Sequence, residues 1–286
     1  MRIALVTCEE KPEGTADDRI LQAALGAKGH AGEYKIWSDP EADWEKFDLA
    51  LLRSPWDYYK RLPEFLAWTS RVSRSTRLAN PLDTVRENAT KDYLLDLEKR
   101  GLAIVPSFFA KDRATAIDAG YQMLRNGPIV VKPAVSGGSF LTYLVRSAKE
   151  LETPVQQVLA HSEALLQPFM DSVPADGEIS LIYFRVGASW KYSHSVLKTA
   201  APEEFRVQTD FAGKVERFEP SRKLFAFAEQ ILQRLSPGDL YVRIDLVDWK
   251  KSPKIGEIEL IEPALFFAFS DQAAALQIEA IEAILA

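Results

Sequence analysis

The sequence predicts an α/β fold that becomes α+β toward the C-terminus, and three observations support this. Short apolar runs alternate with helical stretches up to Asn80, which is typical of a layered α/β sheet. From Glu178 onward the chain is mostly strand-like. The composition, 47% hydrophobic and 27% charged, is that of an ordinary folded protein of 286 residues, a length that can hold about one to three domains.

The first part of the chain alternates strand and helix. Strands are expected at residues 2–7, 31–37, 48–52 and 77–80, and helices at 17–27 and 61–73. Gly29 follows the first helix as its stop signal. The run at 48–52 is almost wholly apolar, as buried strands of a parallel sheet are. This alternation predicts an open α/β layer.

The pattern changes after Asn80. Asn88 is predicted to cap a helix that runs to Arg100 and stops at Gly101. Further strands are expected at 104–105, 128–133, 141–146, 164–169, 179–186 and 189–196, and in a hairpin over 240–263. Further helices are expected at 113–125, 150–160 and 221–235, and from residue 271 onward.

Charge and cysteine content exclude some classes of protein. The net charge of −6 and the pI near 5.3 argue against general nucleic-acid binding, which usually needs a basic surface. Cys8 is the only cysteine, so an intrachain disulfide is excluded and a reducing compartment fits. No apolar run is long enough to span a membrane, and the first one is too short for a signal peptide. We therefore expect a cytoplasmic protein with neither nucleic acid nor membrane as a partner.

Two acidic residues near the C-terminus carry the strongest chemical signal. Asp245 and Glu262 lie in strand-like segments separated by a short polar turn. A hairpin would place both carboxylates side by side in an apolar setting, where an unpaired charge is costly. Mg²⁺ prefers one or two protein carboxylates together with substrate phosphates, and Arg243 shares a strand face with Asp245. The pattern indicates a site for Mg²⁺ and phosphate; the alternative is a salt-bridged hairpin on a solvated face.

A loop of small residues indicates a phosphate site. The strand that ends in Lys132 leads into Ser136-Gly137-Gly138-Ser139, whose backbone N–H groups could close over phosphates. Lys132 could place its charge on the same phosphates. The loop matches neither a Walker A motif nor G-x-G-x-x-G, and a flexible hairpin turn is the alternative.

Other charged residues stand at the ends of predicted elements. Lys91 lies in the first turn of a predicted helix, where the helix dipole disfavours a cation, and this hints at a ligand. Glu178 follows a turn, and Lys198 and Arg206 each end a strand. His194 is interpreted as structural. No Ser-His-Asp or Cys-His arrangement and no zinc site is indicated.

The order of these features resembles the ATP-grasp superfamily. A helix lysine, a strand lysine, a glycine loop, an apolar hinge at 165–169, an acid, an Arg-x-Asp pair and a final Glu follow one another along nearly the whole chain. The chain is most similar to the branch of glutathione synthetases, ribosomal-modification ligases and D-alanine–D-alanine ligases. Segments 51–58 and 258–263 also resemble the subgroup of cycloserine-forming synthetases.

The resemblance implies an ATP-grasp fold of three parts. These are an open α/β N-terminal substrate domain at 1–84, a small mixed lid subdomain at 85–166, and a C-terminal antiparallel sheet with the metal site at 167–286. ATP would lie between the last two parts. The implied activity is ATP-dependent ligation of a small carboxylate and an amine, forming a C–N bond and ADP through an acylphosphate. The substrate would be amino-acid-like or a peptide, and a homodimer is left open.

The resemblance also implies a role for each site residue. The ATP phosphates would be held by Lys91, Lys132, Ser136, Gly137, Gly138 and Ser139. Adenine would be held by Gln167, Pro168 and Phe169, and ribose by Glu178. Lys198 would approach the γ-phosphate, with Arg243 and Arg206 as further catalytic residues. Mg²⁺, which Mn²⁺ could replace, would be held by Asp245, Glu262 and Glu259.

One departure from the superfamily pattern leaves an alternative open. Members often carry Glu-x-Asn at the final metal site, but here Glu262 is followed by Pro263-Ala264. Either Glu259 or water would complete the metal shell. A degenerate member that binds nucleotide as a regulatory or interaction module, without turnover, is therefore the alternative. A nicotinamide oxidoreductase is a more distant one, because no Gly-rich turn follows the first strand.

The segment after the third predicted strand is a candidate substrate site. The apolar run ends in Arg53-Ser54-Pro55-Trp56-Asp57, and ligands of open α/β sheets collect beyond the carboxyl ends of strands. Arg53 could pair with a substrate carboxylate and Asp57 with an ammonium group, with Ser54 and Trp56 beside them. The alternative is that Trp56 and the following tyrosines pack against the lid and that Arg53 is salt-bridged.

Overall fold

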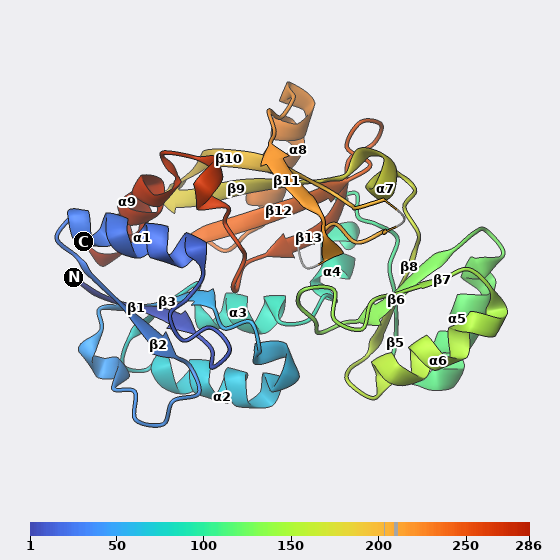
Figure 1. The fold of residues 1–286 in the computed structure, drawn as a ribbon, viewed down its shortest axis with the longest axis horizontal. Helices are drawn as coiled ribbons and strands as arrows, with labels where there is room; N and C mark the ends of the chain where they lie inside the picture. The colour runs from blue at the N-terminus through green and yellow to red at the C-terminus, as the bar shows by residue number, and fades with distance from the viewer. Residues whose placement is uncertain (203, 209–210) are drawn as a thin grey trace.

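The structure is a computed structural model and describes residues 1–202, 204–208 and 211–286. Within these residues the strands form three sheets, which succeed one another along the chain (Figure 1). The first is parallel, and the pairs of the other two are antiparallel. The α/β prediction with an α+β C-terminal part is therefore confirmed.

The N-terminal layer is a four-stranded parallel sheet in the order β2-β1-β3-β4. Its strands are β1 (Arg2–Thr7), β2 (Ala31–Ile36), β3 (Leu49–Ser54) and β4 (Arg77–Ala79), and its helices are α1 (Ala16–Ala27), η1 (Trp44–Lys46), η2 (Tyr58–Lys60) and α2 (Leu62–Val72). Thr15 and Asp18 form a reciprocal capping box that starts α1. All six residues of β3 are buried, as the apolar run predicts, so the functional side chains of this layer lie at and beyond its carboxyl end.

The middle part of the chain forms a second four-stranded sheet in the order β5-β8-β6-β7. Its strands are β5 (Phe108–Ala110), β6 (Ile129–Pro133), β7 (Tyr143–Val145) and β8 (Ala164–Pro168), and its helices are α5 (Arg113–Leu124) and α6 (Ala148–Leu159). The two helices pack on this sheet over a separate apolar core that includes Ile129, Leu151 and Leu166. This unit stands to the side of the rest of the molecule (Figure 1).

The C-terminal part is a five-stranded antiparallel sheet in the order β11-β10-β9-β12-β13. Its strands are β9 (Glu178–Val186), β10 (Ser189–Thr199), β11 (Lys214–Arg217), β12 (Tyr241–Val247) and β13 (Lys254–Glu259), and its helices are α7 (Ser172–Asp176), α8 (Arg222–Leu232), η4 (Phe267–Phe269) and α9 (Ala273–Leu285). Helix α9 contacts both β9 and α1, so one apolar core joins the first and last parts of the chain. The two termini consequently lie close together (Figure 1).

The predicted helix over 88–100 is wrong. The structure has two shorter helices there, α3 (Leu82–Asn88) and α4 (Tyr93–Lys99), so Asn88 ends a helix instead of starting one. Its amide is used by the end of β13: it donates to the Ile258 carbonyl at 2.8 Å and accepts from the Leu260 N–H at 2.9 Å. This tertiary pairing takes the place of the capping bond, and it leaves Lys91 in the turn between the two helices.

Packing attaches α4 to the C-terminal sheet. Leu94, Leu97 and Ile104 belong to the same apolar cluster as Ile244 and Ile258. The predicted strand at 104–105 is a single parallel bridge from Ile104 to Ile255, and the neighbouring strand β5 begins only at Phe108. Strand β11 was not anticipated from the sequence. No helix among the described residues is both long and apolar enough to cross a membrane.

Candidate active site

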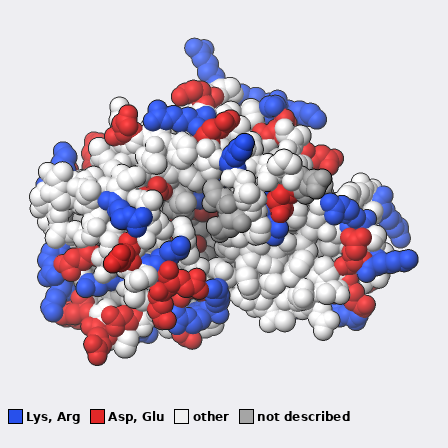
Figure 2. Space-filling model, viewed as in Figure 1, with Lys and Arg blue, Asp and Glu red and all other residues white. Residues whose placement is uncertain are grey.

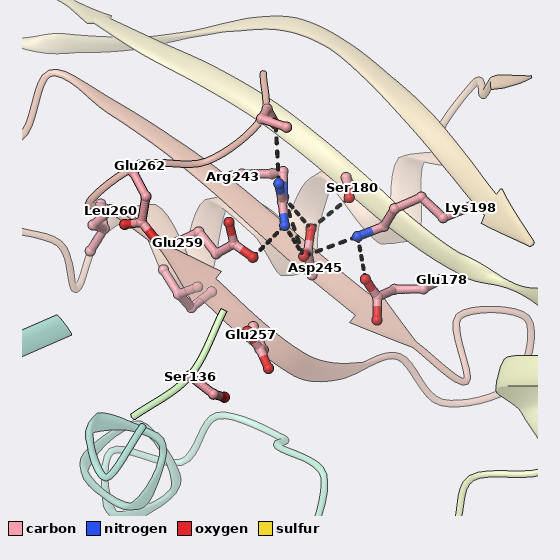
Figure 3. A network of polar contacts seen from close by, with 12 residues as sticks. Ser136, Glu178, Ser180, Lys198, Arg243, Asp245, Glu257, Glu259, Leu260 and Glu262 are labelled. Carbon is pink, nitrogen blue, oxygen red and sulfur yellow. Dashed lines mark hydrogen bonds and ion pairs between the residues drawn. The ribbon is translucent and has the colours of Figure 1, made fainter. Parts of the chain in front are cut away.

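The C-terminal sheet gathers a chain of charged side chains on one face (Figure 3). Asp245 on β12 is 2% exposed and accepts from the Nε and Nη2 of Arg243, at 3.0 and 2.9 Å. Ser180 on β9 donates its hydroxyl to Asp245 at 2.6 Å, and the Nζ of Lys198 on β10 donates at 3.1 Å. Period-2 alternation brings Arg243 and Asp245 to one face, as the sequence predicts.

Lys198 also contacts Glu178, at the start of β9. The turn before Glu178 requires glycine, because Gly177 has a φ of +78° and a Cβ there would lie 2.6 Å from the Lys198 carbonyl oxygen. The backbones of β9 and β10 thus meet closely enough for Glu178 and Lys198 to pair across the sheet. Burial raises the pKa of Glu178 despite this cation.

The hairpin of β12 and β13 does not place Glu262 beside Asp245, so that part of the prediction is wrong. The cross-strand neighbour of Asp245 is Glu257, and that of Arg243 is Glu259. Strand β13 ends at Glu259, and Glu262 lies three residues further on, where the chain turns away before Pro263. Arg243 joins this segment to the hairpin, because its Nη2 contacts Glu259 and its Nη1 donates to the Ala264 carbonyl at 3.1 Å.

Glu257 was missed in the sequence analysis although it is central to the site. It accepts from Lys132 Nζ at 3.0 Å, and Lys91 Nζ lies 3.9 Å from its other oxygen. Lys91 also donates to the carbonyl of Ser136 at 2.9 Å, so both predicted phosphate lysines meet beside the glycine loop. The available signal was alternation: Glu257 stands two residues before Glu259 in the same strand and therefore on the same face.

Electrostatics divide the acids of this site into two kinds. Burial alone would raise the pKa of Asp245, but the charges of Arg243 and Lys198 hold it well below its usual range. Lys91 and Lys132 lower the pKa of Glu257 against the same effect of burial. Burial instead raises the pKa of Glu259 to about 7 and that of Glu262 to about 8, and Glu259 adds its own repulsion to Glu262.

These acids fit a divalent cation by chemistry rather than by ready-made geometry. Among the residues that the structure describes, no three histidine, cysteine or carboxylate side chains are gathered as a metal-binding group. Asp245 is paired with Arg243 and Lys198, and Glu259 is paired with Arg243, whereas Glu262 has no ion-pair partner among the described residues. Carboxylate oxygens are the donors that hard cations prefer, so a cation bound here would share Asp245 and Glu259 with the basic side chains that already contact them.

The predicted hinge residues lie at the end of β8, where the middle sheet leads into the C-terminal part of the chain. Gln167 donates its side-chain amide to the Ser107 hydroxyl at 2.9 Å. The N–H of Phe169 donates to the Pro128 carbonyl at 2.9 Å, and its ring lies 6.4 Å from that of Phe205. A cavity of about 410 Å³ opens beside the hinge, lined by Phe169, Leu144, Arg146, Ala200, Glu204 and Phe205.

Arg206 has a local partner instead of one in the Asp245 cluster. Its Nη2 donates to Glu204 at 2.7 Å, and its guanidinium lies over the ring of Phe211. The structure thus places it in the loop that follows β10, beside the hinge cavity rather than among the acids.

The predicted substrate segment is built around a buried arginine. Arg53 is 2% exposed, and its Nε donates to Asp18 at 2.9 Å, so the alternative of a salt-bridged Arg53 is present in the structure. Its Nη1 is buried and has no hydrogen-bond partner among the described residues. Ser54 donates to the same carboxylate at 2.9 Å, on its other oxygen. Asp18 therefore fixes the position of Arg53, while the Nη1 group of the guanidinium is left without a protein acceptor among the described residues.

The next residues of this segment have other contacts. Asp57 accepts from the Trp37 indole at 2.7 Å and from Arg61 at 2.8 Å, so both of its oxygens have protein donors. An ammonium group would have to displace one of them. Trp56 is 36% exposed, and its indole donates to the Glu262 carbonyl at 3.0 Å. The segment thus contacts the backbone of Glu262, one of the predicted metal ligands. Figure 2 shows the molecule from the same side as Figure 1. On this face acidic and basic side chains are interspersed, and there is a hollow near the centre.

Comparison with known proteins identifies the family. Residues 3–80 match the family model described as the N-terminal domain of D-cycloserine synthetase DcsG. In an alignment 289 positions long, which covers 95% of each chain, the sequence is 33% identical to the cycloserine biosynthesis protein DcsG of Streptomyces lavendulae. The chain belongs to the DcsG family of ATP-grasp ligases. As a member, it is an ATP-dependent ligase that forms C–N bonds, and the predicted resemblance is confirmed.

Solved structures agree with the DcsG assignment. The crystal structure of D-cycloserine synthetase DcsG aligns over 100% of both chains with a TM-score of 0.87 and 30% identity. D-alanyl-alanine synthetase A of Vibrio cholerae aligns over 100% of this chain and 98% of its own, with a TM-score of 0.74 and 12% identity. A RimK-domain ATP-grasp protein of Sphaerobacter thermophilus gives 0.69 and 18%, covering 100% and 99% of the two chains. The two more distant likenesses show the shared ATP-grasp fold.

Proposed function

We propose that this DcsG-family ligase closes or joins an amide-type C–N bond on a small amino-acid substrate, through an acylphosphate and with Mg²⁺. The observation that carries the proposal is the convergence of two charged groups at the hairpin. Asp245 with Arg243 and Lys198 stands on β12, and Glu257 with Lys91 and Lys132 stands across from it on β13.

We propose that the nucleotide binds between residues 167–169 and the glycine loop at 136–139. Adenine would enter the cavity beside Phe169, which directly follows Gln167 and Pro168 at the end of β8. Glu178, which pairs with Lys198, would hold ribose. The phosphates would meet Lys91, Lys132 and the backbone of 136–139, since the two lysines already converge there. A cluster of cations and N–H groups is what a triphosphate requires.

The metal would be held by Asp245, Glu259 and Glu262, which supply oxygen donors close to those phosphates. When bound, the metal neutralises charge on the oxygens of the transferred phosphoryl group. Burial raises the pKa of Glu259 to about 7 and that of Glu262 to about 8, so any proton that either acid carries would leave when the cation binds. Arg243 stays protonated because Asp245 and Glu259 offset its burial, and it can offset negative charge on the phosphoryl group.

The proposed reaction needs no nucleophilic side chain. A substrate carboxylate oxygen attacks the γ-phosphorus, the bond to the β-phosphate oxygen breaks, and ADP leaves. An amine nitrogen then attacks the acyl carbon, and the phosphate leaves with the C–O electron pair while the nitrogen loses a proton. The enzyme supplies positioning and charge stabilisation, which can account for most of the rate in phosphoryl transfer.

The substrate class is proposed from the relatives and from Arg53. The DcsG sequence and the DcsG crystal structure, both similar to this chain, carry cycloserine in their names. Cycloserine is a five-membered ring whose carbonyl carbon bonds to an alkoxyamine nitrogen, so its closure needs an activated carboxylate and an amine in one molecule. A buried arginine with uncommitted N–H donors suits one end of such a small amino acid. A cytoplasmic location, where ATP is available, fits this reaction.

The test is ATP-dependent turnover of β-aminooxy-alanine, the open-chain amino acid obtained by hydrolysing the cycloserine ring. Each enantiomer is incubated with the enzyme, ATP and Mg²⁺, and ADP release is measured together with the product mass. We expect ADP release and loss of one water from the amino acid. D-alanine and dipeptides serve as acceptors for joining two molecules. A purified, nucleotide-binding enzyme that releases no amine-dependent ADP with any of these would contradict the proposal.

A further inference from the structure

The loop of residues 135–140, which we propose to hold the phosphates, contacts the N-terminal layer as well as its own sheet. The ring of Tyr59 lies 5.2 Å from that of Phe140 and 6.3 Å from that of His161, and the last two rings are 5.1 Å apart. Tyr59 comes from η2, Phe140 from the loop that follows Gly138, and His161 from the end of α6. Three aromatic rings from three separate segments therefore meet at the edge of the phosphate site.

The loop backbone approaches Tyr59 closely as well. A Cβ added to Gly137 would lie 3.3 Å from two atoms of the tyrosine ring, so this position has little room for a side chain. His161 donates its Nε2 proton to the Val135 carbonyl at 3.1 Å, which holds the other end of the loop. Residues 135–140 are thus bracketed between His161 and Tyr59.

The residues that precede Tyr59 are held firmly by the N-terminal layer. Tyr58, its neighbour, is buried in the apolar core of the N-terminal layer with Phe65, at 4.9 Å between ring centroids. Asp57 is fixed by the Trp37 indole and by Arg61. The anchored side chains leave Tyr59 facing the loop, so its position is set by the N-terminal layer and not by the lid.

We propose that Tyr59 is a positioning residue that closes the phosphate loop over bound nucleotide by packing against Phe140. Tyr59 belongs to the segment 53–60, which also carries Arg53 and holds the Glu262 carbonyl through Trp56. Where this inference links the loop to substrate, it rests on the proposed role of Arg53. Closure over nucleotide rests on the proposed phosphate role of residues 136–139, whereas the contact of Tyr59 with this loop is given by the ring geometry.

The experiment is hydrogen–deuterium exchange of residues 136–142 in the presence of Mg²⁺ and AMP-PNP, with no amino-acid substrate. Tyr59→Ala should raise the exchange of this loop, and the dissociation constant of AMP-PNP, by about two- to tenfold, the range of an aromatic pair. Tyr59→Phe should behave like wild type, because the ring makes the contacts. Tyr121→Ala, on the exposed face of α5 where the tyrosine is 45% exposed, is the matched control and should change neither readout.

A second variant removes the other ring of the same contact, the one that the loop contributes. Phe140→Ala removes a half-buried side chain, should leave folding intact, and should reproduce the Tyr59→Ala result. The double variant should have an effect smaller than the sum of the two single ones, because the contact between Tyr59 and Phe140 can be lost only once, whereas each ring also contacts His161 separately. Unchanged loop exchange in Tyr59→Ala or Phe140→Ala, or additive effects in the double variant, would overturn the proposal. An error in the substrate assignment would leave these results unaffected, since no acceptor is present.

Discussion

Glu257 lies directly across the β12–β13 hairpin from Asp245, yet the two carboxylates are neutralised by different cations. Asp245 pairs with Arg243 and Lys198, and Glu257 with Lys132 and Lys91. The lysines that we assign to the phosphates are therefore already engaged by a carboxylate. Any phosphate that binds there has to compete with Glu257.

Glu257→Gln should consequently tighten the binding of metal-free nucleotide. The change removes a negative charge beside the phosphates and releases Lys91 and Lys132 to them. Because Glu257 is 29% exposed, we expect only about a two- to fivefold gain in ADP affinity, measured by calorimetry in EDTA. Glu163→Gln, which breaks the lid-surface pair with Lys111, is the control and should have no effect. Weaker ADP binding in Glu257→Gln would mean that the acid orients the lysines instead of competing for them.

Asp245→Asn should lose both turnover and stability. The structure shows Asp245 as the shared partner of two largely buried cations, Arg243 and Lys198. Removing one partner of such a group leaves uncompensated charge and costs about 3 kcal/mol or more. Urea denaturation measures the loss in the free energy of unfolding, and ADP release measures turnover.

Glu262→Gln is the informative comparison for that variant. Among the described residues the Glu262 carboxylate has no ion-pair partner, and burial and Glu259 raise its pKa to about 8. Loss of its charge should therefore leave the free energy of unfolding unchanged or higher at pH 8.5. Turnover should still fall by about a hundredfold or more if Glu262 holds the metal. Normal turnover in Glu262→Gln would remove it from the metal site.

Arg53→Lys should weaken substrate use and spare ATP. Lysine can keep the charge next to Asp18 but lacks the planar fork, so the ion pair survives while recognition of a carboxylate suffers. We expect KM for the amino-acid substrate to rise about tenfold, with KM for ATP within about twofold of wild type. Arg53→Ala is a poorer test, because it leaves the Asp18 carboxylate buried without its partner. Equal changes in both KM values would refute a role for Arg53 that is separate from nucleotide binding.

His194 should make the free energy of unfolding depend on pH. Burial lowers its pKa from 6.5 to about 4, and its Nε2 proton is donated to the Phe266 carbonyl. Between those values the unfolded chain binds a proton that the folded chain does not, so stability falls as pH decreases from about 6.5 to about 4. One such proton contributes a slope of up to about 1.4 kcal/mol per pH unit.

The check on this prediction compares wild type with His194→Gln by urea denaturation at several pH values. Other carboxylates titrate in the same range, Asp239 among them, because burial raises its pKa to about 6. They are common to both proteins, so the difference between the two slopes belongs to His194. Parallel curves for the two proteins would show that His194 is not buried in its neutral form.

Local patterns in the sequence determined the elements and their order. Alternation of apolar residues predicted the strands, and it also placed Arg243 and Asp245 on one face, because that relation depends only on strand periodicity. The succession of Lys91, Lys132, the glycine loop and the final acids was sufficient to indicate the ATP-grasp family. These are relations within a segment or along the chain, and neither needs knowledge of contacts.

Tertiary structure alone decided which charges meet. Lys132 and Glu257 are 125 residues apart, and Arg53 and Asp18 are 35 apart, so no local pattern pairs them. Asn88 ends a helix because the end of β13 supplies partners for its amide, which outweighs its preference for a cap. Tyr59 meets Phe140 because the N-terminal layer and the lid come together there. Such contacts follow from how separate sheets pack, and that packing is decided by the apolar cores that join them.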